Sequence, residues 1–169
     1  RFAAREYLRW AERFLEPPGP RLIAIGGVSG SGKSVLARRL APAVLPAPGA
    51  LVLRSDVIRK SLFGVSAPSR LGPEGYTKSV TEHVYAALGN HAATALNAGH
   101  AVIVDAVFGD PSQRRAIAEV GQRFDVPFVG LWLDAPVDVL MDRLRSRQAD
   151  ASDATVEILQ QQLTRDVGA

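Results

Sequence analysis

The sequence of 169 residues contains no cysteine and no long apolar run. The absence of cysteine excludes disulfides and thiolate metal sites, and it fits a reducing compartment. A membrane-spanning helix needs roughly 18 consecutive apolar residues, and no stretch approaches that length. The start also lacks the basic-then-apolar pattern of a secretory signal. We therefore expect a cytoplasmic protein with no membrane partner.

Lysine is also scarce, because Lys33, Lys60 and Lys78 are the only three. Arginine carries almost all of the positive charge, and the formal net charge is +3. A mild arginine excess suits anionic ligands such as phosphates. It is too small to indicate nucleic-acid binding by itself. Hydrophobic residues at 47% and charged residues at 22% are typical of a globular domain.

The chain has two expected parts. Residues 1–20 hold an amphipathic helix at 3–16 and a stiff "PPGP" linker. Because the chain starts at Arg1, we expect this part to lead in from an upstream domain. Residues 21–169 alternate apolar strands with helical patterns, which predicts a doubly wound parallel α/β sheet of four to five strands. The strands are expected at 21–27, 50–55, 100–107 and 127–134, and the helices at 33–45, 56–63, 75–98, 111–124, 136–148 and 153–166.

The stretch "GGVSGSGKS" at 26–34 follows the first of these strands and contains G-x-x-x-x-G-K-S without a departure. Its glycines let backbone N–H groups turn inward as an anion-binding nest at a helix N-terminus. Lys33 can neutralise the β- and γ-phosphates, and the Ser34 hydroxyl can bind Mg²⁺. The loop predicts a P-loop NTPase that binds ATP or GTP. The expected nucleotide-binding residues are Gly27, Ser29, Gly30, Ser31, Gly32, Lys33, Ser34 and Val35.

Asp105 ends the apolar strand "AVIVDAVF" and is the second expected magnesium ligand besides Ser34. The alternative is an aspartate that caps the next turn. Ala106 follows, so the carboxylate that hydrolytic ATPases place after this aspartate is absent.

Asp56 begins a helix directly after the second strand, and Arg59 lies three residues further on the same side. If the second strand lies near the first, Asp56 faces the γ-phosphate, because parallel strands open their carboxyl ends to one crevice. Asp56 could then deprotonate an acceptor hydroxyl, and Arg59 could hold a polar or anionic part of the acceptor. The alternative is an N-cap aspartate and a solvated arginine.

The phosphate loop, "RSDVIRK" and "VIVDAVF" resemble the P-loop kinases that include polynucleotide 5′-kinases, gluconate kinases, zeta toxins and chloramphenicol phosphotransferase. More narrowly, "LRSDVIRKSLFG", "GLWLDAP" and "ADASDAT" resemble the ATP-binding AAA-type domain that follows an aminoglycoside-phosphotransferase-like domain in bacterial fusion proteins. The resemblance covers roughly residues 21–160. It implies a kinase fold and activity, with Asp56 as general base and Arg59 as the acceptor-phosphate arginine.

In kinases of this class the stretch matching 134–155 forms a lid whose arginines close over the triphosphate. Arg143 and Arg147 share a helix face here, with Arg145 turned away. The resemblance implies catalytic roles for these two, against the alternative of a solvated helix face. We expect Ser152 or Asp153 only to cap the final helix.

The sequence therefore predicts an ATP- and Mg²⁺-dependent phosphotransferase that transfers the γ-phosphate to a hydroxyl of a small polar acceptor. One alternative is a 5′-hydroxyl polynucleotide kinase, which is not favoured because few exposed stacking residues are visible. The other is a module that senses ATP for a fused partner and transfers nothing.

Overall fold

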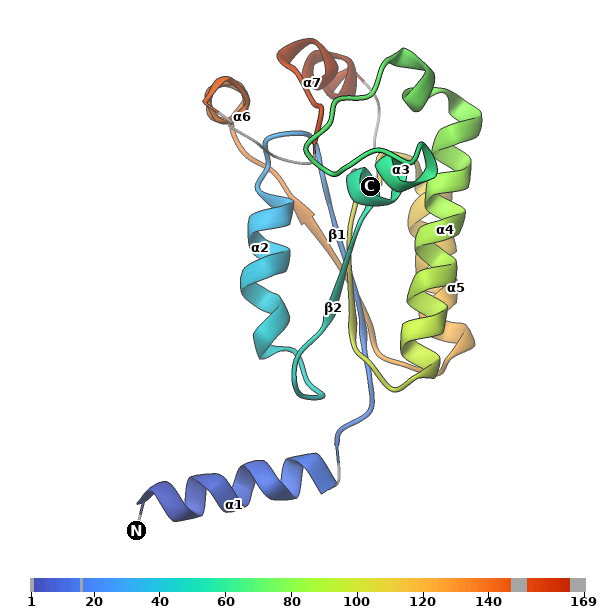
Figure 1. The fold of residues 1–169 in the computed structure, drawn as a ribbon. Coiled ribbons are helices and arrows are strands. Elements are labelled where there is room, and N and C mark those ends of the chain that lie inside the picture. The colour runs from blue at the N-terminus through green and yellow to red at the C-terminus, as the bar shows by residue number, and fades with distance from the viewer. Residues whose placement is uncertain (1, 16, 147–151, 165–169) are drawn as a thin grey trace.

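The computed structural model describes residues 2–15, 17–146 and 152–164. One parallel sheet lies between helices on its two faces, with α2 on one face and α4 and α5 on the other (Figure 1). This arrangement confirms the α/β class. The strands are β1 (Leu22–Gly27), β2 (Leu51–Arg54), β3 (Val102–Asp105) and β4 (Phe128–Leu133). The helices are α1 (Phe2–Leu15), α2 (Lys33–Leu40), α3 (Ser55–Leu62), α4 (Lys78–Asn97), α5 (Pro111–Arg123), α6 (Val137–Arg145) and α7 (Val156–Leu163), with 3₁₀ turns η1 (Ala41–Ala43) and η2 (Pro73–Tyr76).

The sheet has the order β2-β3-β1-β4, and all three strand pairs are parallel. β2 is therefore not adjacent to β1, because β3 lies between the two strands. β3 is buried at every position, which suits a central strand covered by helices on both faces. The carboxyl end of β3 consequently lies between the ends of β1 and β2.

Alternate residues of β1 enter two different core layers. Leu22 and Ala24 belong to the apolar layer under α4 and α5, whereas Ile23 and Ile25 belong to the layer under α2. This follows from the period of two in a strand, and it explains why the strand is apolar without interruption. The two layers fix α2 on one face of the strand ends and α4 on the other.

Several helices are shorter than the sequence patterns predict. α2 ends at Leu40 because Pro42 has no N–H to donate, and the chain tightens there into η1. The last described helix begins only at Val156, with Thr155 as its N-cap. The sequence pattern correctly located these helices but extended them into the turns that follow or precede them.

Helix α1 lies apart from the sheet in Figure 1 and carries exposed apolar side chains, with Tyr7 77% and Leu8 61% exposed. Across the described residues, no helix is both long and apolar enough to cross a membrane.

Candidate active site

The phosphate loop joins β1 to α2 through glycines with positive φ angles. Gly30 has φ 84° and Gly32 has φ 98°, which other residues rarely adopt. A Cβ on Gly30 would lie 2.8 Å from the Leu140 carbonyl oxygen, so the loop and α6 approach too closely for a side chain. Lys33 is the first residue of α2, and the N-terminus of that helix therefore opens toward the loop.

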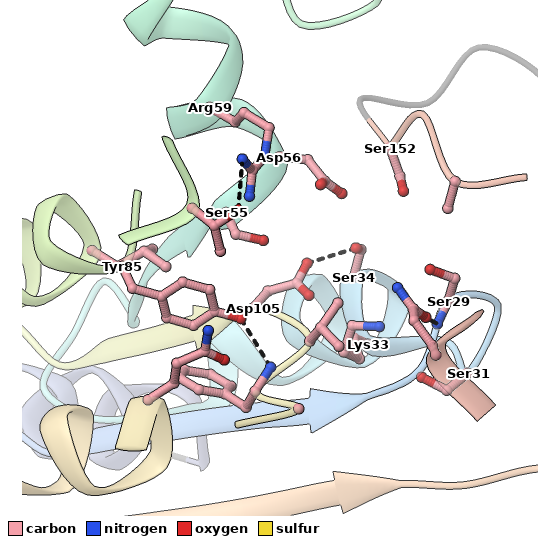
Figure 2. Close-up of a pocket in the computed structure, with 18 of the residues that line it drawn as sticks. Ser29, Ser31, Lys33, Ser34, Ser55, Asp56, Arg59, Tyr85, Asp105 and Ser152 are labelled. Atoms are coloured by element: carbon pink, nitrogen blue, oxygen red, sulfur yellow. Dashed lines mark hydrogen bonds between the residues drawn. The ribbon is translucent and has the colours of Figure 1, made fainter. Parts of the chain in front are cut away.

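Lys33 folds back over the loop, where its Nζ donates a hydrogen bond to the Val28 carbonyl oxygen at 2.9 Å. The ammonium group therefore lies beside the part of the loop that precedes Gly30. Ser29 and Ser31 line the same cavity as Lys33 (Figure 2), and so do Gly32 and Val35. Gly27 is not among the cavity-lining residues, because it lies against β4.

Ser34 and Asp105, the two predicted magnesium ligands, are in direct contact. The Ser34 hydroxyl donates to Asp105 Oδ2 at 2.6 Å, and Arg54 Nε lies 3.4 Å from the same oxygen. Asp105 is 5% exposed, at the carboxyl end of the central strand. A hydroxyl and a carboxylate are hard oxygen donors of the kind that Mg²⁺ prefers, so this pair fits the ion.

Asp56 lies at the start of α3 and faces the space above Ser34 and Asp105 (Figure 2). Burial raises the pKa of its carboxyl above the ordinary value, and the negative charge of Asp105 raises it further. Arg54, a hydrogen bond from Ser152 and Lys33 act in the opposite direction without cancelling the rise. A half-buried carboxylate with a raised pKa can accept a proton better than an ordinary aspartate.

Arg59 lines the same cavity but is already bound to protein groups. It is 7% exposed, and it donates to the Gly75 carbonyl oxygen at 2.7 Å and to Thr81 Oγ1 at 3.4 Å. Its guanidinium also lies over the Tyr76 ring, 4.9 Å from the ring centre. Arg59 therefore holds η2 against α3 and α4, in addition to any contact with a ligand.

Of the predicted lid arginines, Arg143 reaches the phosphate loop. Its Nη1 lies 3.3 Å from the Gly30 carbonyl oxygen and 3.5 Å from that of Ser31. Arg145 points away and pairs with Asp142 on the exposed side of α6. Arg147 lies outside the described residues.

Sequence reasoning missed a buried ion pair beside this site. Lys60 is 1% exposed, and its Nζ lies 2.9 Å from Asp153 Oδ1. The other oxygen of Asp153 accepts hydrogen bonds from Leu71 N at 3.0 Å and from the Tyr76 hydroxyl at 2.7 Å. Asp153 is therefore not the cap of α7, a role that Thr155 takes. The partners of the ion pair lie 93 residues apart in sequence, so local patterns gave no signal.

The cavity around these groups measures about 1730 Å³. Pockets for a single small ligand usually hold about 300–1,000 Å³, so this space has room for a nucleotide and a second substrate. Beyond Asp56, its wall comes from one face of α4 and the first turns of α5. The residues of that wall include Lys78, Glu82, Tyr85, Gly89, Asp110, Ser112, Gln113 and Ile117. Arg70, Arg114 and Arg115 do not line the cavity.

A phosphate loop, a hydroxyl–aspartate pair and a second carboxylate on one parallel sheet define a P-loop domain of the kinase-like type. The family model described as AAA domain matches residues 22–165. The chain belongs to that family.

Known proteins resemble the chain along most of its length. An uncharacterized protein of Mycobacterium tuberculosis is 35% identical over 159 residues, which cover 92% of this chain. The chain spans only 31% of that relative. The APS kinase CysC of M. tuberculosis, solved with AMPPNP and APS, has a TM-score of 0.60 at 25% identity and covers 77% of this chain and 71% of its own. A gluconokinase from Sinorhizobium meliloti has a TM-score of 0.58 at 25% identity, covering 85% and 73%.

Proposed function

We propose that the chain is an ATP- or GTP-dependent phosphotransferase that moves the γ-phosphate to a hydroxyl of a small polar acceptor. One observation carries the proposal. Asp56, a half-buried carboxylate with a raised pKa, lines the same cavity as Lys33 and Ser34 of the phosphate loop. A module that only senses nucleotide has no need of a base in that position.

Each group then has a role in in-line transfer. Lys33 and Arg143 neutralise the charge that develops on the transferred phosphoryl group. Ser34 and Asp105 would hold Mg²⁺, which supplies further charge neutralisation when bound. Asp56 orients the acceptor hydroxyl and takes its proton. Arg59 holds η2 at the edge of the acceptor space.

The acceptor wall favours a compact polar molecule. Glu82 and Asp110 contribute carboxylates to it and Lys78 contributes one ammonium group, while the guanidinium of Arg59 is already bound to Gly75 and Thr81. Such a wall suits a neutral polyol or amine better than a long polyanion. The structural similarity to an APS kinase and a gluconokinase also supports transfer to a small substrate.

The experiment measures the transfer of labelled phosphate from γ-labelled ATP to four classes of acceptor in parallel. These are sugars, nucleosides, aminoglycosides and 5′-hydroxyl oligonucleotides. We expect labelling of a small hydroxylated compound with mild salt dependence. Efficient labelling of oligonucleotides alone would instead establish the polynucleotide kinase. In that case the logarithm of the binding affinity should fall by about 0.7 per neutralised phosphate for each tenfold rise in salt concentration.

Asp56→Asn separates a kinase from a sensor. Without the proton acceptor, transfer should fall by a factor of about 10² to 10⁴ while nucleotide binding persists. Asp138→Asn is the matched control, since Asp138 also lies in the first turn of a helix but is exposed and outside the cavity. Unchanged ATP turnover in Asp56→Asn, including slow transfer to water, would leave Asp56 as a structural residue only.

We further propose that residues 1–20 connect residues 21–169 to an upstream phosphotransferase-like domain. The exposed apolar side chains of α1, among them Tyr7 and Leu8, support this division.

A further inference from the structure

Gln162 on α7 contacts the phosphate loop directly. Ser29 N donates a hydrogen bond to its Oε1 at 2.7 Å, although the two residues lie 133 positions apart in sequence. Because a backbone N–H requires an acceptor, the amide oxygen must face the loop and the Nε2 must face away from it. Gln162 also lines the cavity, and no described residue accepts a hydrogen bond from its Nε2.

The packing of α7 holds this side chain in place. Leu159, one turn earlier on the same helix, is fully buried in a cluster with Val28, Leu140 and Leu144. Val28 belongs to the phosphate loop and directly precedes Ser29. The apolar cluster and the Gln162 hydrogen bond therefore fix the same helix to the same part of the loop.

The position of Lys33 shows which phosphate this part of the loop would meet. Lys33 Nζ is bonded to the carbonyl oxygen of Val28, the residue before Ser29. The lysine of such a loop reaches the β- and γ-phosphates, so its Nζ marks the part of the loop nearest to the terminal phosphate. The free end of the Gln162 amide is therefore on the side of the terminal phosphate.

We propose that Gln162 binds the terminal phosphate of the nucleoside triphosphate. Its Oε1 is held by Ser29 N–H, and its Nε2 donates to a γ-phosphate oxygen. This assignment rests on the proposed nucleotide site and adds a selection for triphosphate over diphosphate. A neutral amide suits the role because one end accepts from the loop while the other donates to the anion.

Gln162→Glu tests the assignment, because glutamate keeps an oxygen for Ser29 N–H but replaces the donor with a negative charge. Binding of AMPPNP and of ADP, each with Mg²⁺, is measured by calorimetry. We expect AMPPNP affinity to fall about tenfold or more, since a charge-assisted hydrogen bond is lost and repulsion is added. ADP affinity should change much less.

Gln160→Glu is the matched control, with the same change of charge on an exposed position of α7 that does not line the cavity. It should leave both affinities within about twofold, as expected for an exposed surface position. Equal AMPPNP affinity in the two variants would overturn the role of Gln162, as would equal losses for AMPPNP and ADP in Gln162→Glu. A chain that binds AMPPNP but transfers no phosphate would overturn only the proposed function. A chain that binds no AMPPNP would overturn both.

Discussion

Replacing Lys60 by methionine should destabilise the fold strongly. The change keeps most of the length of the side chain but removes the terminal ammonium group from a residue that is 1% exposed. The carboxylate of Asp153 then stays buried with only Leu71 N and the Tyr76 hydroxyl as donors. Breaking a buried ion pair from one side costs about 3–5 kcal/mol, and the two remaining donors place the expected loss near the lower end of that range.

The double variant Lys60→Met/Asp153→Asn shows whether the pair itself carries this cost. Asp153→Asn alone removes the charge that balances the buried Lys60 ammonium, which then has only neutral acceptors such as the Ala67 carbonyl oxygen at 2.8 Å. With both changes neither position 60 nor position 153 holds a buried charge, so the free energy of unfolding of the double variant should fall by about 1–3 kcal/mol less than the sum of the losses in the single variants.

The assay is urea denaturation followed by far-UV circular dichroism, at equal protein concentration and pH. Lys78→Met is the control, because its partner Glu82 is 3.9 Å away and the two side chains are 92% and 67% exposed. The free energy of unfolding of that variant should fall by at most about 0.5 kcal/mol. If Lys60→Met lost no more stability than Lys78→Met, or if the losses from Lys60→Met and Asp153→Asn were additive, the buried ion pair would not contribute to the stability of the fold.

The pH dependence gives an independent check on the same pair. Burial raises the pKa of Asp153, but hydrogen bonds from Tyr76, Leu71 N and Lys60 lower it more, so the net pKa lies below 3.8. A depressed carboxyl pKa adds stability above the unfolded pKa, and that stability is lost as pH falls through the folded pKa. The stability difference between the unchanged chain and Asp153→Asn should therefore be constant near neutral pH and shrink below about pH 4.

The remaining predictions concern the phosphate loop. Lys33→Ala should weaken Mg²⁺–ATP binding strongly, because one charge-assisted contact is lost; equal calorimetric affinities would contradict this role. Arg143→Ala should lower the rate of phosphate transfer, while Arg145→Ala, on the exposed side of α6, should not; equal rates would show that Arg143 only braces the loop. Ser34→Ala should reduce the dependence of nucleotide affinity on Mg²⁺ in a titration with the metal, and an unchanged dependence would exclude the hydroxyl as a ligand.

The sequence could predict those parts of the site that lie close together in the chain. The phosphate loop is a contiguous motif with a strand before it and a helix after it, so local chemistry defines it. The apolar runs around Asp105 and before Asp56 identified parallel strands whose ends meet at one edge. The order of the strands could not be predicted this way, because nothing in the sequence at 100–107 indicates that β3 lies between β1 and β2.

Contacts between distant segments were beyond the reach of the sequence. Lys60 and Asp153 each look like ordinary surface charges, and only the fold brings them together in the interior. Gln162 lies in a run of three glutamines, where nothing distinguishes the one that contacts Ser29. Long-range polar pairs have no periodic signal, because their partners are set by tertiary packing and not by local propensity.

The segment from Asp153 to Gln162 connects the two halves of the proposed reaction. At its start, Asp153 binds Lys60 of α3 and Tyr76 of η2, and Tyr76 lines the cavity next to the proposed acceptor space. At its end, Gln162 binds the phosphate loop through Ser29 N. Between these two points Leu159 is fully buried, so the segment cannot shift at one end without disturbing its packing at the other. The position of η2 at the edge of the proposed acceptor space and the shape of the phosphate loop are therefore held by one continuous piece of chain.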